Sequence, residues 1–198
     1  MKFRAIHIAS ILILTAFIFT AACTGSSGQD NSEISGYIED LYSDDKDTVT
    51  SAVKELAASG EAAVNPLINV FSSGNQQASG YAAVALVYIG EPAIEPLTKK
   101  LGSDNEDESD WASNTLALMG SKAVPDLIEI VNTGSDTEKE QAAITLIKIG
   151  ENALPLLNLE LNTNAEADQA EIISIIRSIE ATQNLQEKLN YTADAASV

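Results

Sequence analysis

Apolar residues recur along the chain with a period of 30 residues. From Gly60 onward the sequence divides into four gapless rows of 30, which begin at Gly60, Gly90, Gly120 and Gly150. In the first half of each row, apolar residues stand four places apart. In the second half, an apolar residue is followed by others four and seven places later. Such spacing is typical of the buried face of a helix, so each row predicts two amphipathic helices.

The predicted core positions are shared by the rows. In the first helices they are Ala63, Leu67, Phe71, Ala93, Leu97, Leu101, Ala123, Leu127, Val131, Ala153, Leu157 and Leu161. In the second helices they are Ala82, Leu86, Ile89, Ala112, Leu116, Met119, Ala142, Leu146, Ile149, Ile172, Ile176 and Ile179. Residues 37–59 fit the same register as a divergent first repeat. The sequence therefore predicts an all-α protein, a right-handed α-solenoid (superhelix) of about five helix pairs over residues 37–182.

The turns between the predicted helices also recur. The glycine that opens each row is expected to adopt the left-handed conformation that ends a helix. A hydroxyl residue at the fourteenth place, such as Ser73 or Ser103, is expected to cap the helix that follows. At the C-terminal end, residues 183–198 are predicted to form a short polar capping helix, residues 183–191, and a frayed tail.

The first 22 residues have the pattern of a signal peptide. Lys2 and Arg4 precede an apolar run centred on Ile11 to Phe19, and small residues lead to Cys23. Thr20-Ala21-Ala22-Cys23 resembles the lipobox of prokaryotic lipoproteins, which implies export and a lipid anchor on Cys23. Ordinary cleavage and an uncleaved anchor are the alternatives. Residues 23–36 are rich in Gly, Ser and polar residues and are expected to form a flexible tether.

Charge and composition exclude several functions. The chain has 11 Lys and Arg against 29 Asp and Glu, a net charge of −18, which disfavours nucleic-acid binding. Because Lys2 and Arg4 lie in the signal peptide and no acid does, 9 minus 29 leaves −20 after cleavage. The single Cys and the single His lie within the first 23 residues, so a zinc site and His-based catalysis are not expected in the processed chain. We predict no enzyme activity, catalytic residue, metal or cofactor.

Two segments with a recognisable repeat motif suggest a family. IGEPAIEPLTKKL, residues 89–101, and AAVALVYIG, residues 82–90, resemble the HEAT-like repeats of the phycobilin lyase (PBS lyase) type, over roughly residues 37–180. The resemblance implies stacked helix pairs. Bilin attachment is not expected, because lyases of that type act with a partner on a photosynthetic antenna protein and this chain is predicted to be exported.

Two further motifs are candidate sites. The acidic run of residues 104–110 suggests either a solvated helix start, in which the acids complement the helix dipole, or weak binding of a divalent cation. The first reading is favoured, because the run lacks the glycine and the bidentate glutamate of an EF-hand loop. Asn190-Tyr191-Thr192 permits glycosylation in a host that performs it.

The outer face of the second helices is the predicted binding site. It carries apolar residues at repeat places 22, 25 and 29, with polar ends on the flanking repeats, and these residues are Tyr81, Val84, Tyr88, Trp111, Leu118 and Ile144. Tyr81, Tyr88 and Trp111 are expected to form one exposed patch. Lateral packing between neighbouring second helices is the alternative that would bury the rings without a partner.

These patterns predict a monomeric, non-catalytic protein-protein interaction scaffold. It would be exported, anchored by lipid to the cell membrane (its extracytoplasmic face) or to an outer membrane, and would bind a protein partner through the concave face of its repeats. A structural or assembly factor of an envelope complex is the alternative, and a lyase-like accessory subunit is a third.

Overall fold

The structure, a computed structural model, describes residues 30–163 and 169–196, and its regular elements there are all helical, with no strand. The chain divides into two units between Glu33 and Ile34, and the described helices from Ile34 onward belong to the second unit. The helices are α1 (Asp30–Asp40), α2 (Lys46–Ala58), α3 (Glu61–Val70), α4 (Gln76–Ile89), α5 (Ile94–Thr98), α6 (Glu106–Met119), α7 (Val124–Thr133), α8 (Asp136–Ile149), α9 (Leu154–Thr163) and α10 (Gln169–Ala196). Short 3₁₀ turns separate several of them: Phe71–Ser73, Glu91–Ala93, Gly120–Lys122 and Gly150–Ala153.

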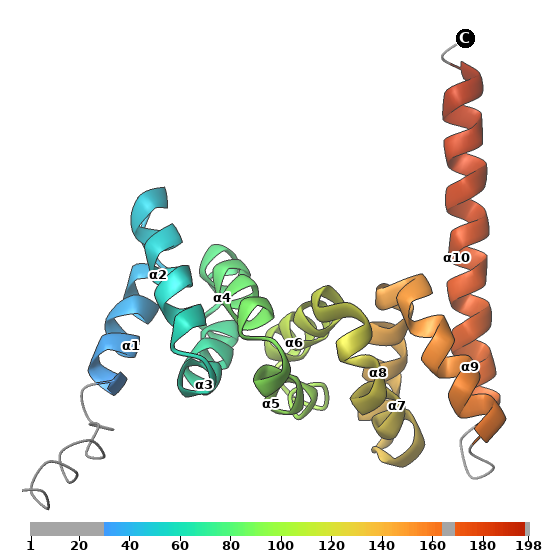
Figure 1. The fold of residues 1–198 in the computed structure, drawn as a ribbon, viewed down its shortest axis with the longest axis horizontal. Coiled ribbons are helices and arrows are strands. Elements are labelled where there is room, and N and C mark those ends of the chain that lie inside the picture. The colour runs from blue at the N-terminus through green and yellow to red at the C-terminus, as the bar shows by residue number, and fades with distance from the viewer. Residues whose placement is uncertain (1–29, 164–168, 197–198) are drawn as a thin grey trace, which may run out of the picture. The chain divides into compact units, whose positions relative to one another are not determined.

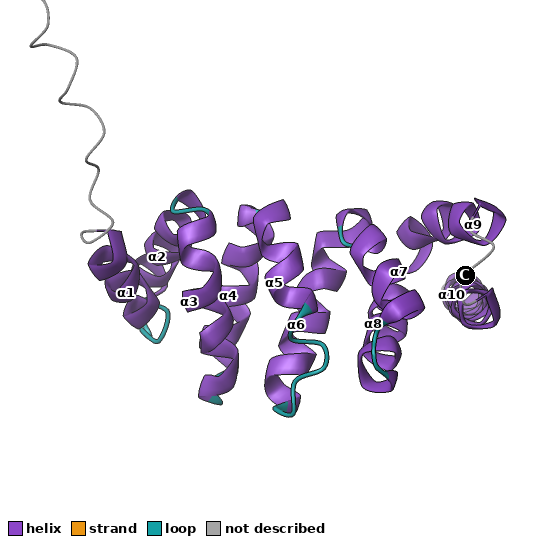
Figure 2. Ribbon diagram, turned by 90° about the horizontal axis from the view of Figure 1, so that it is seen from below, coloured by secondary structure: helices purple, strands orange, loops and turns teal. Residues whose placement is uncertain are grey.

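The helices of the second unit pack in two layers. Helices α2, α4, α6, α8 and α10 contact one another in that order, and α3, α5, α7 and α9 do the same. Within each repeat the two helices also pack together, as α3 does on α4 and α7 on α8 (Figures 1 and 2). The predicted all-α class and the assignment of two helices to each row are therefore confirmed.

The core lies between the two layers at the predicted repeat positions. Leu67, Leu97, Leu127 and Leu157 of the first helices are fully buried, and so are Leu86, Leu116 and Leu146 of the second helices. Each removes apolar surface from water, and full burial of such a side chain contributes about 1.5–3 kcal/mol. The 30-residue register read from the sequence thus places the correct residues inside.

Buried serine hydroxyls near the start of two of the second helices join the two layers. Ser79 Oγ donates to the carbonyl of Val70, at 3.3 Å, and Ser109 Oγ donates to the carbonyl of Leu101, at 2.8 Å. The Val70 carbonyl is at the end of α3 and the Leu101 carbonyl lies in the turn after α5, where backbone oxygens lack an intrahelical partner. In these two repeats the hydroxyls therefore tie the second helix to the end of the preceding segment and satisfy a backbone oxygen.

The glycine that opens each row adopts a positive φ, as predicted. Gly90 has φ 78° and ψ −132°, and Gly120 has φ 64° and ψ −136°. The ψ values differ from the left-handed helical conformation that the sequence analysis expected, and they place these residues in a region that side chains with a Cβ rarely enter. The backbone conformation at these positions therefore favours glycine.

The capping residues lie two places after the predicted ones. Asn75 and Asn105 cap α4 and α6, because their side-chain oxygens accept hydrogen bonds from the backbone N–H groups of Ala78, at 3.0 Å, and Glu108, at 3.3 Å. The expected caps, Ser73 and Ser103, instead accept the N–H groups of the asparagines themselves, each at 3.2 Å. The serine hydroxyls stabilise the turn, and each asparagine side chain satisfies a free N–H group at the start of the helix.

Two predicted boundaries were wrong. Helix α1 begins at Asp30, inside the tether expected over residues 23–36, because Ile34 is buried and begins an apolar spacing that continues through Ile38 and Leu41. At the other end, the short capping helix predicted over residues 183–191 is part of the single 28-residue helix α10. No proline or glycine interrupts residues 169–196, so nothing in that stretch stops the helix.

Candidate functional site

The second helices carry large apolar side chains on the side away from the core. Val84 and Tyr88 of α4 are 41% and 74% exposed, Leu118 of α6 is 66% exposed, and Ile144 of α8 is 36% exposed. The four residues occupy only two of the repeat places, the twenty-fifth and the twenty-ninth. Because every 30-residue repeat contributes one second helix, residues at the same repeat place lie on the same side of successive second helices. We call these four residues the apolar face.

Trp111 does not belong to the exposed patch that the sequence analysis expected. Its ring is half-buried and stacks on the fully buried ring of Phe71, with the ring centroids 6.0 Å apart and the planes 20° apart. Gly80 of α4 makes room for the indole, since a Cβ atom added there would lie 3.7 Å from Trp111 Cη2. Trp111 is thus a packing residue between α4 and α6, as the alternative interpretation of lateral packing holds.

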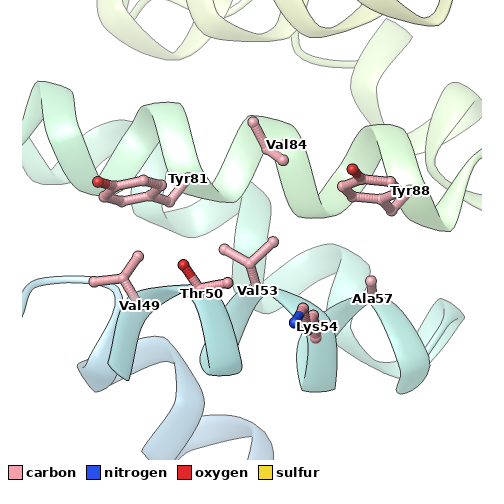
Figure 3. A pocket seen from close by; sticks show the side chains of 8 residues that line it. All are labelled: Val49, Thr50, Val53, Lys54, Ala57, Tyr81, Val84 and Tyr88. Atoms are coloured by element: carbon pink, nitrogen blue, oxygen red, sulfur yellow. The ribbon is translucent and has the colours of Figure 1, made fainter. Parts of the chain in front are cut away.

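Tyr81 is also half-buried, but it borders an open groove together with Tyr88. The groove lies between α2 and α4 and has a volume of about 670 Å³. Its remaining lining residues are Val49, Thr50, Val53, Lys54, Ala57 and Val84 (Figure 3). In Figure 3 the two helices run in the same direction, with Val49 and Thr50 near Tyr81 and Ala57 near Tyr88.

Sequence reasoning missed most of the α2 wall of this groove. It did not single out Val49, Val53 or Ala57 as residues of the binding face. Val53 is the α2 residue at the repeat place of Ala83, which is buried in α4. Val49 and Val53 are buried and yet line the groove, so they border the outer surface as well as the core, which a division of places into inward and outward does not allow for.

A polar network occupies the corresponding place between α6 and α8. Lys148 Nζ donates to Ser113 Oγ and to Asn114 Oδ1, each at 3.0 Å. The hydroxyls of Ser113 and Thr145 lie 2.9 Å apart, and Thr145 donates its own proton to the carbonyl of Gln141 at 2.6 Å. Ser113 is therefore the donor to Thr145, and the network runs in one direction from Lys148 to the α8 backbone.

The acidic run of residues 104–110 forms the start of α6, and one of its carboxylates is committed to internal contacts. Glu108 is buried and accepts hydrogen bonds from Ser103, at 2.6 Å, and Ser72, at 3.4 Å, and Lys100 Nζ lies 3.0 Å away. Burial raises the pKa of Glu108, but the bonds from Ser103, Lys100 and Ser72 outweigh it and hold the pKa below its ordinary value. In the described part of the chain, no group of three His, Cys, Asp or Glu is arranged to hold a metal ion.

Several predicted features lie outside the described residues. These are the signal peptide of residues 1–22, the lipidation site Cys23 and the chain up to residue 29. The side chain of Asn190, in the predicted glycosylation motif, is likewise not described. Within residues 30–163 and 169–196, no helix has the length and apolar character needed to cross a membrane.

Comparison with known proteins gives no family. No family model matches the chain, and no curated protein matches it. Among solved structures, the chain is similar to an engineered protein from the Northeast Structural Genomics Consortium, with 20% sequence identity and a TM-score of 0.30 over 74% of this chain and 79% of that one. The assignment of function therefore depends on the residues of this chain alone.

Proposed function

We propose that the protein is a non-catalytic protein-binding scaffold that captures its partner on the apolar face of the second helices. The observation that carries the proposal is the recurrence of Val84, Tyr88, Leu118 and Ile144 at two repeat places of three successive helices. Single exposed apolar residues are ordinary on protein surfaces, whereas apolar residues grouped on one face are typical of interaction sites. A partner that covers them gains the free energy of apolar burial at each one.

In this proposal the two helix layers form a right-handed α-solenoid of HEAT-like pairs, and the second helices line its concave side. The contacts between successive even-numbered helices and the 30-residue repeat support this arrangement. The proposal also keeps the lipid anchor at Cys23, which would hold the scaffold at the outer side of a membrane. Metabolic labelling with a fatty acid tests the anchor, because the label should be lost in Cys23→Ala.

Capture from solubilised membranes tests the binding face. The double variant Tyr88→Ser/Leu118→Ser removes two side chains of the apolar face that bury little in the free protein. The matched control is Tyr42→Ser/Leu159→Ser, which removes two other exposed large residues, 44% and 55% exposed, from outside that face. We expect one partner to be captured by the wild type and the control and lost by the first variant. Equal capture by all three would contradict the proposal.

A further inference from the structure

The second helices from α2 to α8 meet at three junctions, and at two of them the protein's own side chains bridge the helices. Between α4 and α6, the Trp111 ring lies over Gly80. Between α6 and α8, Lys148 reaches across to Ser113 and Asn114. Between α2 and α4, the junction is an open groove of about 670 Å³.

The repeat register explains why side chains of these two kinds do not bridge α2 and α4. Tyr81 stands in α4 where Trp111 stands in α6, but the residue at the place of Gly80 is Thr50, which has a side chain where the glycine has none. Tyr88 stands where Lys148 stands in α8, and the residue that it would have to reach, at the place of Ser113, is Val53. A tyrosine hydroxyl has no hydrogen bond to make to a valine, so Tyr88 stays 74% exposed.

The walls of the groove are apolar and nearly free of charge. Helix α4 contains no charged residue among its 14, and Lys54 is the one charged group among the residues lining the groove. The line from Tyr81 to Tyr88 covers seven residues, which at about 1.5 Å per residue is about 10 Å, or two helical turns. That length matches a ridge formed by side chains at i, i+3, i+4 and i+7 of a bound helix.

The charge surrounding the groove indicates the kind of partner. Exposed carboxylates stand near the start of α2, at Asp47, and near the start of α6, the other neighbour of α4, at Asp107 and Asp110. The whole chain carries a net charge of −18, which opposes the docking of a second copy and favours a basic molecule. The aliphatic stem of Lys54 can lie along an apolar ridge while its ammonium group stays in water.

From these observations we infer that the α2–α4 groove receives the apolar ridge of a helical segment from a basic partner protein. The inference rests on the proposed binding function and makes it more specific, since it names the part of the face that anchors the partner. Bridging of the other two junctions would leave Leu118 and Ile144 as secondary contacts.

Peptide binding to the full chain, held in phosphatidylcholine nanodiscs, tests the inference. The probe is a fluorescent 16-residue helical peptide with leucines at i, i+3, i+4 and i+7 and lysines at the flanks. Two control peptides change one feature each. The first keeps the leucines but has glutamates at the flanks, and the second keeps the lysines but has glutamine in place of each leucine. Empty nanodiscs correct for binding to lipid.

Two double variants separate the groove from the rest of the face. Val84→Ser/Tyr88→Ser removes groove residues, and Leu118→Ser/Ile144→Ser removes residues at the same two repeat places outside the groove. We expect saturable binding of the lysine-flanked leucine peptide, weakened about tenfold or more by the first variant and less than about threefold by the second. Both control peptides should bind more weakly to the wild type by a similar factor.

Other results would overturn the inference. Absence of saturable binding, tighter binding of the glutamate-flanked peptide, or a larger loss in the Leu118/Ile144 variant would each do so. If the wild type forms a dimer and the Val84→Ser/Tyr88→Ser variant is monomeric, a second copy of the chain is the occupant of the groove. The proposed function fails separately, if capture from membranes does not depend on Tyr88 and Leu118.

Discussion

Truncation of Trp111 gives the sharpest test of how the repeats pack, because sequence and structure assign this residue different roles. An exposed ring in a binding patch contributes little to stability, whereas a ring stacked on buried Phe71 holds α6 against the preceding repeat. Replacing a fully buried tryptophan by alanine costs about 3–5 kcal/mol, through lost burial and the cavity left behind. Because Trp111 is half-buried, we expect Trp111→Ala to cost about 2–3 kcal/mol, part of it from the aromatic pair.

Denaturant unfolding followed by far-UV circular dichroism measures this loss. Intrinsic fluorescence is not suitable, because Trp111 is the only tryptophan and the variant would lack it. Leu118→Ala is the matched control on the same helix, and because Leu118 is 66% exposed it should change the free energy of unfolding by less than about 0.5 kcal/mol. Equal, small losses in the two variants would refute the packing role of Trp111.

Two more predictions concern backbone strain and acid stability. Gly90→Ala should destabilise the fold by about 1–3 kcal/mol, because Gly90 has φ 78°. Gly36→Ala should instead stabilise it by about 0.5–1 kcal/mol, because Gly36 lies in helix α1 with open space around it. Thermal melts of both variants check this. Glu108→Gln should cost about 1–2 kcal/mol at neutral pH, where the carboxylate is paired with Lys100. Because the pKa of Glu108 is lowered in the folded protein, the stability that this group gives the wild type is lost as the pH falls through that pKa. In denaturant melts, the difference in free energy of unfolding between wild type and Glu108→Gln should therefore disappear in acid. A difference that does not change with pH would contradict the assignment.

The sequence predicted what depends on periodicity and missed what depends on local exceptions. Leu116 and Leu146 were placed in the core and are fully buried, because a regular repeat gives the same environment to the same place. Trp111 and Tyr81 occupy one repeat place but differ in role, since the residue beneath the first is Gly80 and beneath the second is Thr50. Such pairings depend on which side chains meet between helices, and a helical wheel of one helix does not include them.

The capping residues were missed for a related reason. A hydroxyl at the fourteenth place suggested a cap, but the backbone turn places the sixteenth residue, Asn75 or Asn105, opposite the free N–H groups. Both residue types are good caps, so composition does not choose between them and only the turn geometry does. The length of α10 was missed because a polar sequence without glycine or proline carries no stop signal.

Site-specific photo-crosslinking in cells tests the central claim most directly. A photoreactive phenylalanine analogue is introduced, one position at a time, at Val84, Leu118, Ile144 and, as a control on the other helix layer, Leu159, which is 55% exposed. The account predicts that the first three positions yield an adduct with the same protein and that Leu159 yields none. Adducts of equal strength at all four positions, or an adduct at Leu159 alone, would contradict a partner-binding face on the second helices.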